Sequence, residues 1–343
     1  MQKGLVSVLT PAYNTAAYIP RLLDSVLSQT YPYIEMIVMD DGSTDNLPSV
    51  VKSYIQPFQD KGYTLEYFRQ ENAGQSVAIK NGLQKVRGEF LVWPDSDDYY
   101  ASNKAIALMV HELENAPSEF QIVRTQQRIV KEKTGELIRI KGLDAKVEEP
   151  ADLFEDCLIS KKGFMYTPGS GIVRTQILYE VTHFDIYTSK DAGQNWQLML
   201  PILYKYRCKT IMQPLYNIVA RASSHSRGQF RGYEATVRKY RAYLSTQIET
   251  LKRIDGFPSE LINQYRQQLT LNYNKRLFSV AIRCNNRKAA QERLGLCMAV
   301  EGRSIKSIIF ETLLKLKGGT YFVYASQHFV RKIKKIKKDD THL

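Results

Sequence analysis

The chain has 343 residues, of which 43% are hydrophobic and 24% charged, the composition of an ordinary soluble globular protein. Such a length favours one large domain plus a smaller one, and the absence of any apolar stretch of about 18 residues excludes a membrane-spanning helix. A formal net charge of +13 predicts a polyanionic partner: nucleic acid, anionic lipid or a phosphorylated substrate. No signal-peptide pattern opens the chain, and four widely spaced cysteines without a C-x-x-C favour reduced thiols in a cytosol over structural zinc.

The N-terminal part alternates apolar strand-like runs with helix-like segments. Strands are expected at 5–10, 34–39, 65–68 and 89–93, with helices at 19–27, at 46–59 and up to residue 83. This alternation predicts an α/β fold with a parallel sheet and right-handed crossovers. Polar residues follow all four strands, and ligands of such sheets collect at the carboxyl ends of the strands. We therefore expect one site along this edge.

Three carboxylates, Asp95, Asp97 and Asp98, follow the fourth predicted strand. In an extended chain Asp95 and Asp97 lie on one side, roughly 6–7 Å apart along the backbone. Two carboxylates that close repel each other unless a cation lies between them, and Mg²⁺ or Mn²⁺ suits such hard oxygen ligands when phosphates complete the shell. The alternative for an isolated D-x-D is a helix-capping Asp followed by a solvated turn.

Five segments together resemble family 2 glycosyltransferases, in the same order and at similar spacing over roughly residues 4–225. They are 6–14, 28–31, 37–45, Asn72-x-Gly74 and 95–98. The resemblance implies a GT-A fold, a nucleotide-sugar donor and a divalent metal, Mn²⁺ or Mg²⁺.

The resemblance also implies roles for individual residues. Matched residue by residue, Pro11, Tyr13 and Asp41 would contact the nucleotide base, Asn72 and Gly74 would belong to the donor site, Asp95 would lie near the ribose and the metal, and Asp97 would ligate the metal at the diphosphate.

The residue types suit these roles. An aromatic ring at a strand end, such as Tyr13, can stack on a base, and a carboxylate such as Asp41 can accept the imide N–H of uracil. The alternatives are a core-edge aromatic for Tyr13 and a turn residue before Gly42 for Asp41. A Rossmann dinucleotide site is disfavoured because no G-x-G-x-x-G follows the first strand, and no Walker A sequence is present.

The middle of the chain leaves the catalytic base open. Inverting transfer needs a carboxylate that takes the acceptor's proton. In the resembled family this is usually an Asp, often in a Glu-Asp pair, just before an aromatic residue like Trp196. Gln194-Asn195 stands there instead, and amides accept no proton at neutral pH. Asp191 is the nearest carboxylate, one turn from Asn195 if the helix has begun; its alternative is a plain N-cap.

Other segments of the middle offer candidates for the acceptor side. Residues 128–140 predict a hairpin turning at Thr134-Gly135, and the loop-like 164–171 could line an acceptor groove. Trp196 could pack against the acceptor sugar or belong to the core. His225 lies in the segment 221–226 after a strand-like run, near the place where the resembled family often has a His and a Ser/Arg cluster on a loop closing over the diphosphate; its alternative is a lone surface histidine.

The C-terminal third reads as helical. An apolar stripe runs from Val237 to Leu251, and a second helix covers 261–282. Between Arg303 and Lys338 stand ten basic residues and one acid, with apolar residues at helical spacing from Ile305 and six basic residues in 331–338. Such a basic amphipathic tract suits an anionic membrane surface; a solvated tail is the alternative, and nucleic-acid binding ranks lowest because no recognition motif accompanies the charge.

The sequence thus predicts a GT-A domain at 1–228, a helical domain at 229–302 and a basic amphipathic tail at 303–343. The expected function is metal-dependent inverting transfer from a nucleotide-sugar, most simply a UDP-sugar, to a glycan or lipid-linked acceptor in envelope or capsular polysaccharide synthesis, at the inner face of the cell membrane. The alternatives are a catalytically weak or inactive donor-binding protein and a basic nucleic-acid-binding module. Sugar, acceptor and oligomeric state stay open.

Overall fold

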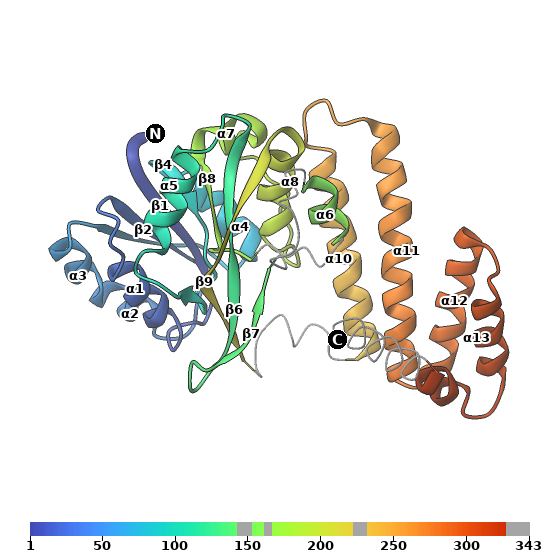
Figure 1. Cartoon of the computed structure of the whole chain (residues 1–343). Coiled ribbons are helices and arrows are strands. Elements are labelled where there is room, and N and C mark those ends of the chain that lie inside the picture. The colour runs from blue at the N-terminus through green and yellow to red at the C-terminus, as the bar shows by residue number, and fades with distance from the viewer. Residues whose placement is uncertain (143–152, 161–166, 222–231, 327–343) are drawn as a thin grey trace, which may run out of the picture. The chain divides into compact units, whose positions relative to one another are not determined.

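The computed structural model describes residues 1–142, 153–160, 167–221 and 232–326. The chain divides into two compact units, one formed by residues 1–222 and 245–258, the other by 223–244 and 259–343. The first contains the sheet and the second is built from helices (Figure 1).

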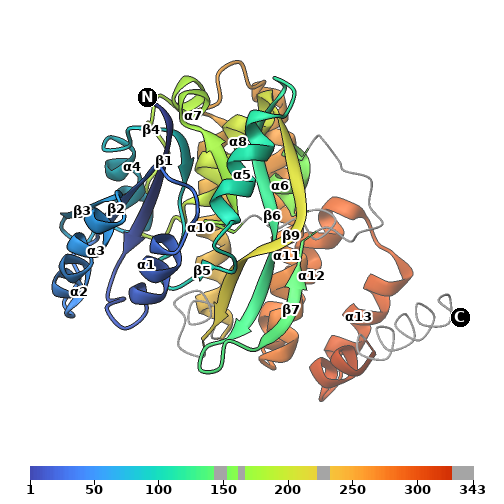
Figure 2. The ribbon, with the colours of Figure 1, turned by 60° about the vertical axis from the view of Figure 1, so that its left-hand side comes forward.

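A nine-stranded mixed sheet organises the first unit, with the order β3-β2-β1-β4-β8-β6-β9-β5 and with β7 paired to β6. The strands are β1 (Gln2–Ala12), β2 (Ile34–Asp40), β3 (Thr64–Arg69), β4 (Gly88–Val92), β5 (Tyr99–Tyr100), β6 (Phe120–Lys131), β7 (Leu137–Lys141), β8 (Gly171–Arg174) and β9 (Arg207–Ala220). β1 pairs in parallel with β2 and β4, and β2 with β3, so the carboxyl ends of these four strands share one edge (Figure 2).

The helices of the first unit connect and cover these strands. They are α1 (Ile19–Leu27), α2 (Leu47–Ser53), α3 (Ile55–Asp60), α4 (Gln75–Leu83), α5 (Ala105–Glu114), α6 (Phe154–Ile159), α7 (Thr175–Thr182) and α8 (Asn195–Lys205). α4 packs on β1 and β2, and α7 packs on β4 and β8. Both helices thus lie over the strands whose ends form the predicted site.

The predicted α/β class and all four early strands are confirmed, with one correction. The helix expected at 46–59 is divided into α2 and α3, because Pro57 has no N–H to donate to the Ser53 carbonyl. β8 begins at Gly171, the last residue of the predicted loop, and runs antiparallel between β4 and β6, so it interrupts the parallel pairing that β6 and β9 resume. The predicted hairpin is present as β6 and β7, with Ile129 opposite Arg139.

Gly82 lets α4 approach the sheet closely. A Cβ at this position would lie 2.8 Å from Cγ of Met39 and would also collide with the Leu9 side chain. Leu9 lies on β1 and Met39 on β2, and both are buried. The glycine therefore seats α4 directly on the two strands and brings the first turn of the helix to the edge where they end.

The second unit consists of α11 (Ser259–Arg283), α12 (Arg287–Glu301) and α13 (Ile305–Lys315), together with the first half of α10 (Tyr233–Leu251). Both helices predicted for this region are confirmed. Its core includes Val237, Phe278 and Leu314. No helix within the described part of the chain is long and apolar enough to cross a membrane.

Candidate active site

The loops that follow β1 and β2 are hydrogen-bonded to each other. The backbone N–H of Asn14 donates to Oγ of Ser43 at 2.9 Å, and Oδ1 of Asn14 accepts the N–H of Thr44 at 2.8 Å. Tyr13, next to this link, is 49% exposed, whereas Pro11 is buried within β1. Of these two predicted base contacts, Tyr13 therefore presents the accessible surface that stacking requires.

The buried carboxylate of Asp41 holds the loop that follows β3. Its Oδ1 accepts hydrogen bonds from the Gln70 side-chain amide at 2.8 Å and from the Ala73 N–H at 2.9 Å. Its Oδ2 accepts the N–H of Gly74 at 2.9 Å, and Nδ2 of Asn72 donates to the Asp41 carbonyl at 3.0 Å. The predicted residues Asp41, Asn72 and Gly74 thus lie together, and the carboxylate fixes the loop's shape; its contact with a base stays a prediction.

Gly74 joins this loop to the segment that precedes α8. Its φ is +100°, and a Cβ at this position would lie 2.9 Å from Cα of Lys190. Nearby, Oγ of Ser76 donates to the Ser189 carbonyl at 2.9 Å and accepts the Ser189 N–H at 3.1 Å. The start of α4 and the residues before α8 are therefore held together, which brings the predicted donor side and acceptor side into contact.

Asp95 receives two amide hydrogen bonds on one oxygen. Nε2 of Gln75, the first residue of α4, donates to its Oδ1 at 2.9 Å, and Nε2 of Gln194 donates at 2.7 Å. Burial, together with the neighbouring Asp97 carboxylate, raises the pKa of Asp95 to about 7, although both amides favour the ionised form. The group is thus a carboxylate whose charge is poorly compensated by the protein itself.

Asp97 and Asp98 have different partners. Nη2 of Arg221 donates to Oδ2 of Asp97, and the guanidinium carbon lies 4.1 Å from the centroid of the Tyr18 ring. Asp98 accepts the N–H of Val219 at 2.8 Å, which ties it to β9. Burial and the two nearby carboxylates raise the pKa of Asp98 well above its usual range. Asp98 therefore has a structural partner, while Asp97 is neutralised by an arginine.

Sequence reasoning missed two of these partners and misread a third. Gln75 has no predicted role, Arg221 is predicted only as part of a His and Ser/Arg cluster and not as the partner of Asp97, and Gln194 is considered only as the position of an absent base. The available signal for Arg221 was a charge placed directly after a strand-like run. For Gln75 there was no signal beyond its place at a helix start.

The residues predicted for the acceptor side are less closely gathered. α8 begins at Asn195 with Gln194 as its N-cap residue, so Asp191 lies exposed in the preceding turn, neither on the helix nor at its N-cap. Trp196 donates from Nε1 to the Cys157 carbonyl at 3.1 Å. His225 and residues 164–166 of the predicted acceptor loop lie outside the described residues.

Among the buried acceptor oxygens without a hydrogen-bond partner at the start of α8 are Oε1 of Gln194 and Oδ1 of Asn195. The ionised Asp95 carboxylate only accepts hydrogen bonds, so the amide nitrogen of Gln194 must face it and Oε1 must face elsewhere. Buried polar oxygens without a donor are costly, which makes both atoms suited to bind a ligand hydroxyl.

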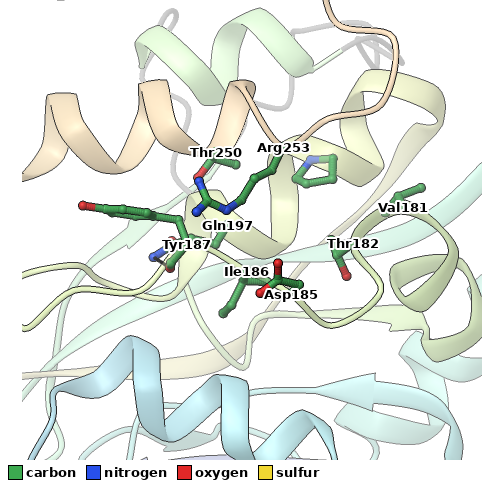
Figure 3. A pocket seen from close by; sticks show the side chains of 9 residues that line it. Val181, Thr182, Asp185, Ile186, Tyr187, Gln197, Thr250 and Arg253 are labelled. Atoms are coloured by element: carbon green, nitrogen blue, oxygen red, sulfur yellow. Dashed lines mark hydrogen bonds between the residues drawn. The ribbon is translucent and has the colours of Figure 1, made fainter.

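A small cavity lies behind the same segment (Figure 3) and includes Asp185, Tyr187, Gln197 and Arg253 in its lining. The Arg253 guanidinium lies 5.4 Å from the Tyr187 ring centroid, and Nε2 of Gln197 donates to the Gly193 carbonyl at 2.6 Å. None of the predicted site residues lines it. These contacts support the turn that carries Asp191 rather than form a second site.

The donor set at Asp95 and Asp97 fits a hard divalent cation. Within residues 1–142, 153–160, 167–221 and 232–326, no group of three or more His, Cys, Asp or Glu side chains is arranged to hold a metal ion by itself. Two carboxylates therefore need further oxygen ligands, which the phosphates of a donor supply in such sites. The raised pKa of Asp95 and the arginine drawn to Asp97 both indicate a place that favours positive charge.

Comparison with known proteins agrees with this geometry. The model of the family described as "Glycosyl transferase family 2" matches residues 7–182, just over half of the chain. An uncharacterised glycosyltransferase of Rickettsia typhi is 33% identical over 149 residues, 43% of this chain and 44% of the relative. TuaG of Bacillus subtilis, a putative teichuronic acid biosynthesis glycosyltransferase, is 36% identical over 102 residues, 30% of this chain and 39% of TuaG. The match thus spans less than half the length of these relatives.

Solved structures share the fold at low sequence identity. S. aureus TarS 1–349 in complex with UDP-GlcNAc has a TM-score of 0.59 and 19% identity, covering 94% of this chain and 88% of TarS 1–349. The mannosyltransferase PcManGT of Pyrobaculum calidifontis in complex with GDP-Man and Mn²⁺ has a TM-score of 0.55 and 18% identity, covering 94% and 84%. The predicted GT-A fold is confirmed. With the family match over residues 7–182, the chain belongs to glycosyltransferase family 2.

Proposed function

We propose that this chain is a metal-dependent, inverting transferase that moves a sugar from a UDP-sugar to a glycan or lipid-linked acceptor in envelope or capsular polysaccharide synthesis. Residues 1–228 would carry the transfer, 229–302 would form a helical domain, and 303–343 would hold the enzyme peripherally at the cytoplasmic face of the membrane. The similarity to TuaG, named for teichuronic acid biosynthesis, supports a polysaccharide product, and the UDP-GlcNAc complex of TarS supports a UDP-linked donor.

One observation carries the proposal: Asp95 and Asp97 lie side by side at the end of β4 with their repulsion only partly relieved. Burial and Asp97 raise the pKa of Asp95 to about 7, so this pair gains most from a cation. Asp95 and Asp97 would hold Mn²⁺ or Mg²⁺ with the donor diphosphate; the Mn²⁺ complex of PcManGT supports this choice. A bound metal would neutralise charge that develops on the leaving diphosphate.

The rest of the edge would bind the nucleoside. The exposed ring of Tyr13 would stack on the base, and Asp41 would shape the loop at Asn72 and Gly74. The oxygens of Asp41 already accept protein N–H groups, so Asp41 would contribute to base recognition through the shape of the loop that it holds.

In the transfer, an acceptor hydroxyl attacks the anomeric carbon from the face opposite the diphosphate. A carbon–oxygen bond forms as the bond to the diphosphate breaks, and the hydroxyl proton passes to a carboxylate. Asp191 is our candidate for that base, held near the donor by the link between Ser76 and Ser189. The free acceptor oxygens of Gln194 and Asn195 would orient sugar hydroxyls without taking a proton.

The test is titration of UDP-hexoses by calorimetry with Mn²⁺ or with a chelator, followed by an assay for sugar release and transfer. We expect Mn²⁺ to tighten UDP-sugar binding, and Asp97→Ala to remove that gain, while the same change at the exposed Asp60 leaves it intact. If neither Mn²⁺ nor Mg²⁺ tightens the binding of any nucleoside diphosphate, the proposed metal dependence is wrong.

Two amides, Gln194 and Asn195, stand where the resembled family usually has its catalytic carboxylate. This favours a second candidate function, a donor-binding protein with little or no transfer activity. It predicts metal-dependent binding without sugar release, unchanged by Asp191→Ala. Turnover that Asp191→Ala abolishes would reject it.

A further inference from the structure

The outer face of α13 exposes aliphatic side chains to solvent. Ile305 is 80% exposed and Ile309 50%, and Ile308 lies beside them on the same side of the helix. The opposite side carries Phe310 and Leu314, which are buried in the core of the second unit. α13 is therefore anchored by one apolar face and displays a second one, an arrangement that a helix folding only for its own unit does not need.

The helical residues that follow expose aromatic rings. Residues 319–326 are helical, with Val323 buried and Tyr321, Phe322 and Tyr324 exposed. The turn between the helices is tight, because a Cβ at Gly319 would lie 2.9 Å from Cα of Leu314. The aromatic segment is thus packed against the end of α13, within the same unit.

Basic residues border the aliphatic face. At about 100° per residue, Lys306 and Lys315 fall on either side of the line through Ile305 and Ile309. Lys317 follows, and Glu311 is paired with Arg303. An apolar strip with one lysine on each side, followed by a segment with tyrosines, has the composition of helices that lie in a lipid interface, where the lysine stems extend to the headgroups.

We propose that this face, formed by the exposed aliphatic side chains of α13 and the aromatic rings of 321–324, docks on an anionic lipid surface. A second copy of the chain is the less suitable occupant, since a two-fold pairing of this face would bring its lysine borders toward each other. The proposal rests on the proposed function, in which a lipid-linked acceptor is used. It adds the surface that would hold the enzyme at the membrane, in residues that are distant in sequence from the catalytic carboxylates.

The experiment is flotation of the full-length protein with vesicles of phosphatidylcholine alone or with about one third phosphatidylglycerol. We expect binding only to the anionic vesicles, and at least a roughly tenfold lower partition coefficient for Ile305→Gln/Ile309→Gln, because two aliphatic side chains no longer enter the interface. For Lys306→Gln/Lys315→Gln/Lys317→Gln the expected loss is on the order of tenfold or more, and it should shrink in high salt.

The matched control is Ile138→Gln/Ile140→Gln on β7, which changes two isoleucines that are each 50% exposed in the first unit. This variant should float like the unchanged protein. UDP binding with Mn²⁺, measured without vesicles, should be the same for all four proteins, so a failure of the transferase proposal would be visible separately.

Two outcomes would overturn the docking proposal. One is unchanged flotation of Ile305→Gln/Ile309→Gln. The other is a dimer in solution that this variant disrupts, without any binding to anionic vesicles, which would make a second copy the occupant.

Discussion

Arg221 donates a hydrogen bond from its Nη2 to Oδ2 of Asp97, at the carboxylate proposed to ligate the metal. The two residues are separated by 124 positions in sequence, and the guanidinium also lies over the ring of Tyr18. Nε of Arg221 is buried and has no hydrogen-bond partner. A cation at Asp97 and this arginine would therefore compete for the same carboxylate.

The first prediction concerns this competition. Arg221→Gln leaves Asp97 without its counter-charge, so we expect the free energy of unfolding without metal to fall by about 1–3 kcal/mol. Mn²⁺ with UDP should raise the melting temperature more in this variant than in the unchanged protein, because the metal no longer displaces a guanidinium. Differential scanning fluorimetry with and without Mn²⁺ measures both effects. An equal metal-induced shift in the two proteins would argue against the competition.

The second prediction is that Asp95→Asn stabilises the metal-free protein. Burial raises the pKa of Asp95 from its usual value to about 7 in the folded chain, so the folded state keeps a proton that the unfolded state has lost, and stability falls as pH rises through this window. At about pH 8 the variant should gain roughly 1–2 kcal/mol in the free energy of unfolding, and at about pH 4 nothing.

Urea unfolding in the presence of a chelator measures this gain, and Asp185→Asn is the control of opposite sign. The hydrogen bond and charge of Lys80 lower the pKa of Asp185, so its stabilising effect is present at neutral pH and is lost as the pH falls. The Asp95 variant should also lose Mn²⁺-dependent donor binding. Destabilisation of Asp95→Asn at high pH would contradict the electrostatic account.

The third prediction concerns the strained backbone and the close contact at Gly74. Gly74→Ala places a Cβ 2.9 Å from the Lys190 backbone at a φ of +100°, whereas Gly62 has a φ of +82° with nothing within 4 Å. At Gly62 the positive φ costs an added side chain about 1–2 kcal/mol. At Gly74 the ψ of 157° places the backbone in a region that essentially only glycine adopts, so its backbone cost is at least as large. We expect Gly74→Ala to cost a further 1–3 kcal/mol or so in urea unfolding, because the segment before α8 must shift. Gly74→Ala should also lower the turnover of UDP-sugar, whereas Gly62→Ala should leave it unchanged. An equal loss in the free energy of unfolding for both variants would show that α4 and the segment before α8 are not tightly joined.

The fourth prediction tests the catalytic base. Asp191→Asn should lower kcat by about 10²- to 10⁴-fold and leave the Kd of the metal–UDP complex unchanged, since the residue acts only on the acceptor proton. Asp255→Asn, at another exposed turn carboxylate, should have no effect.

Asn195→Asp in the Asp191→Asn background then reports where the acceptor hydroxyl lies. Recovery of activity, with a pH profile that rises through the pKa of the new carboxylate, would place that hydroxyl beside the start of α8. Full activity of Asp191→Asn alone would remove Asp191 from the mechanism.

Local sequence determined much of the fold. The apolar runs of β1 to β4 and the helices between them could be predicted because parallel strands joined by helices leave their carboxyl ends on one edge. The same reasoning brought Tyr13, Asp41 and Asp95 to that edge, and Asp41, Asn72 and Gly74 do lie together there. The amphipathic pattern that begins at Ile305 likewise predicted a helix with an apolar face, which is the exposed face of α13.

Only the tertiary structure decided how the carboxylates are partnered. Gln194 is 99 positions from Asp95 and Arg221 is 124 from Asp97, and both contacts depend on where α8 and β9 lie relative to β4. That placement follows from β8 entering antiparallel between β4 and β6, a pairing that the short segment Gly171–Arg174 does not specify by its own pattern. The sequence thus determined which side chains follow the ends of the strands, because the pattern that forms a strand is local. Long-range strand pairing determined which charged and amide side chains these residues contact.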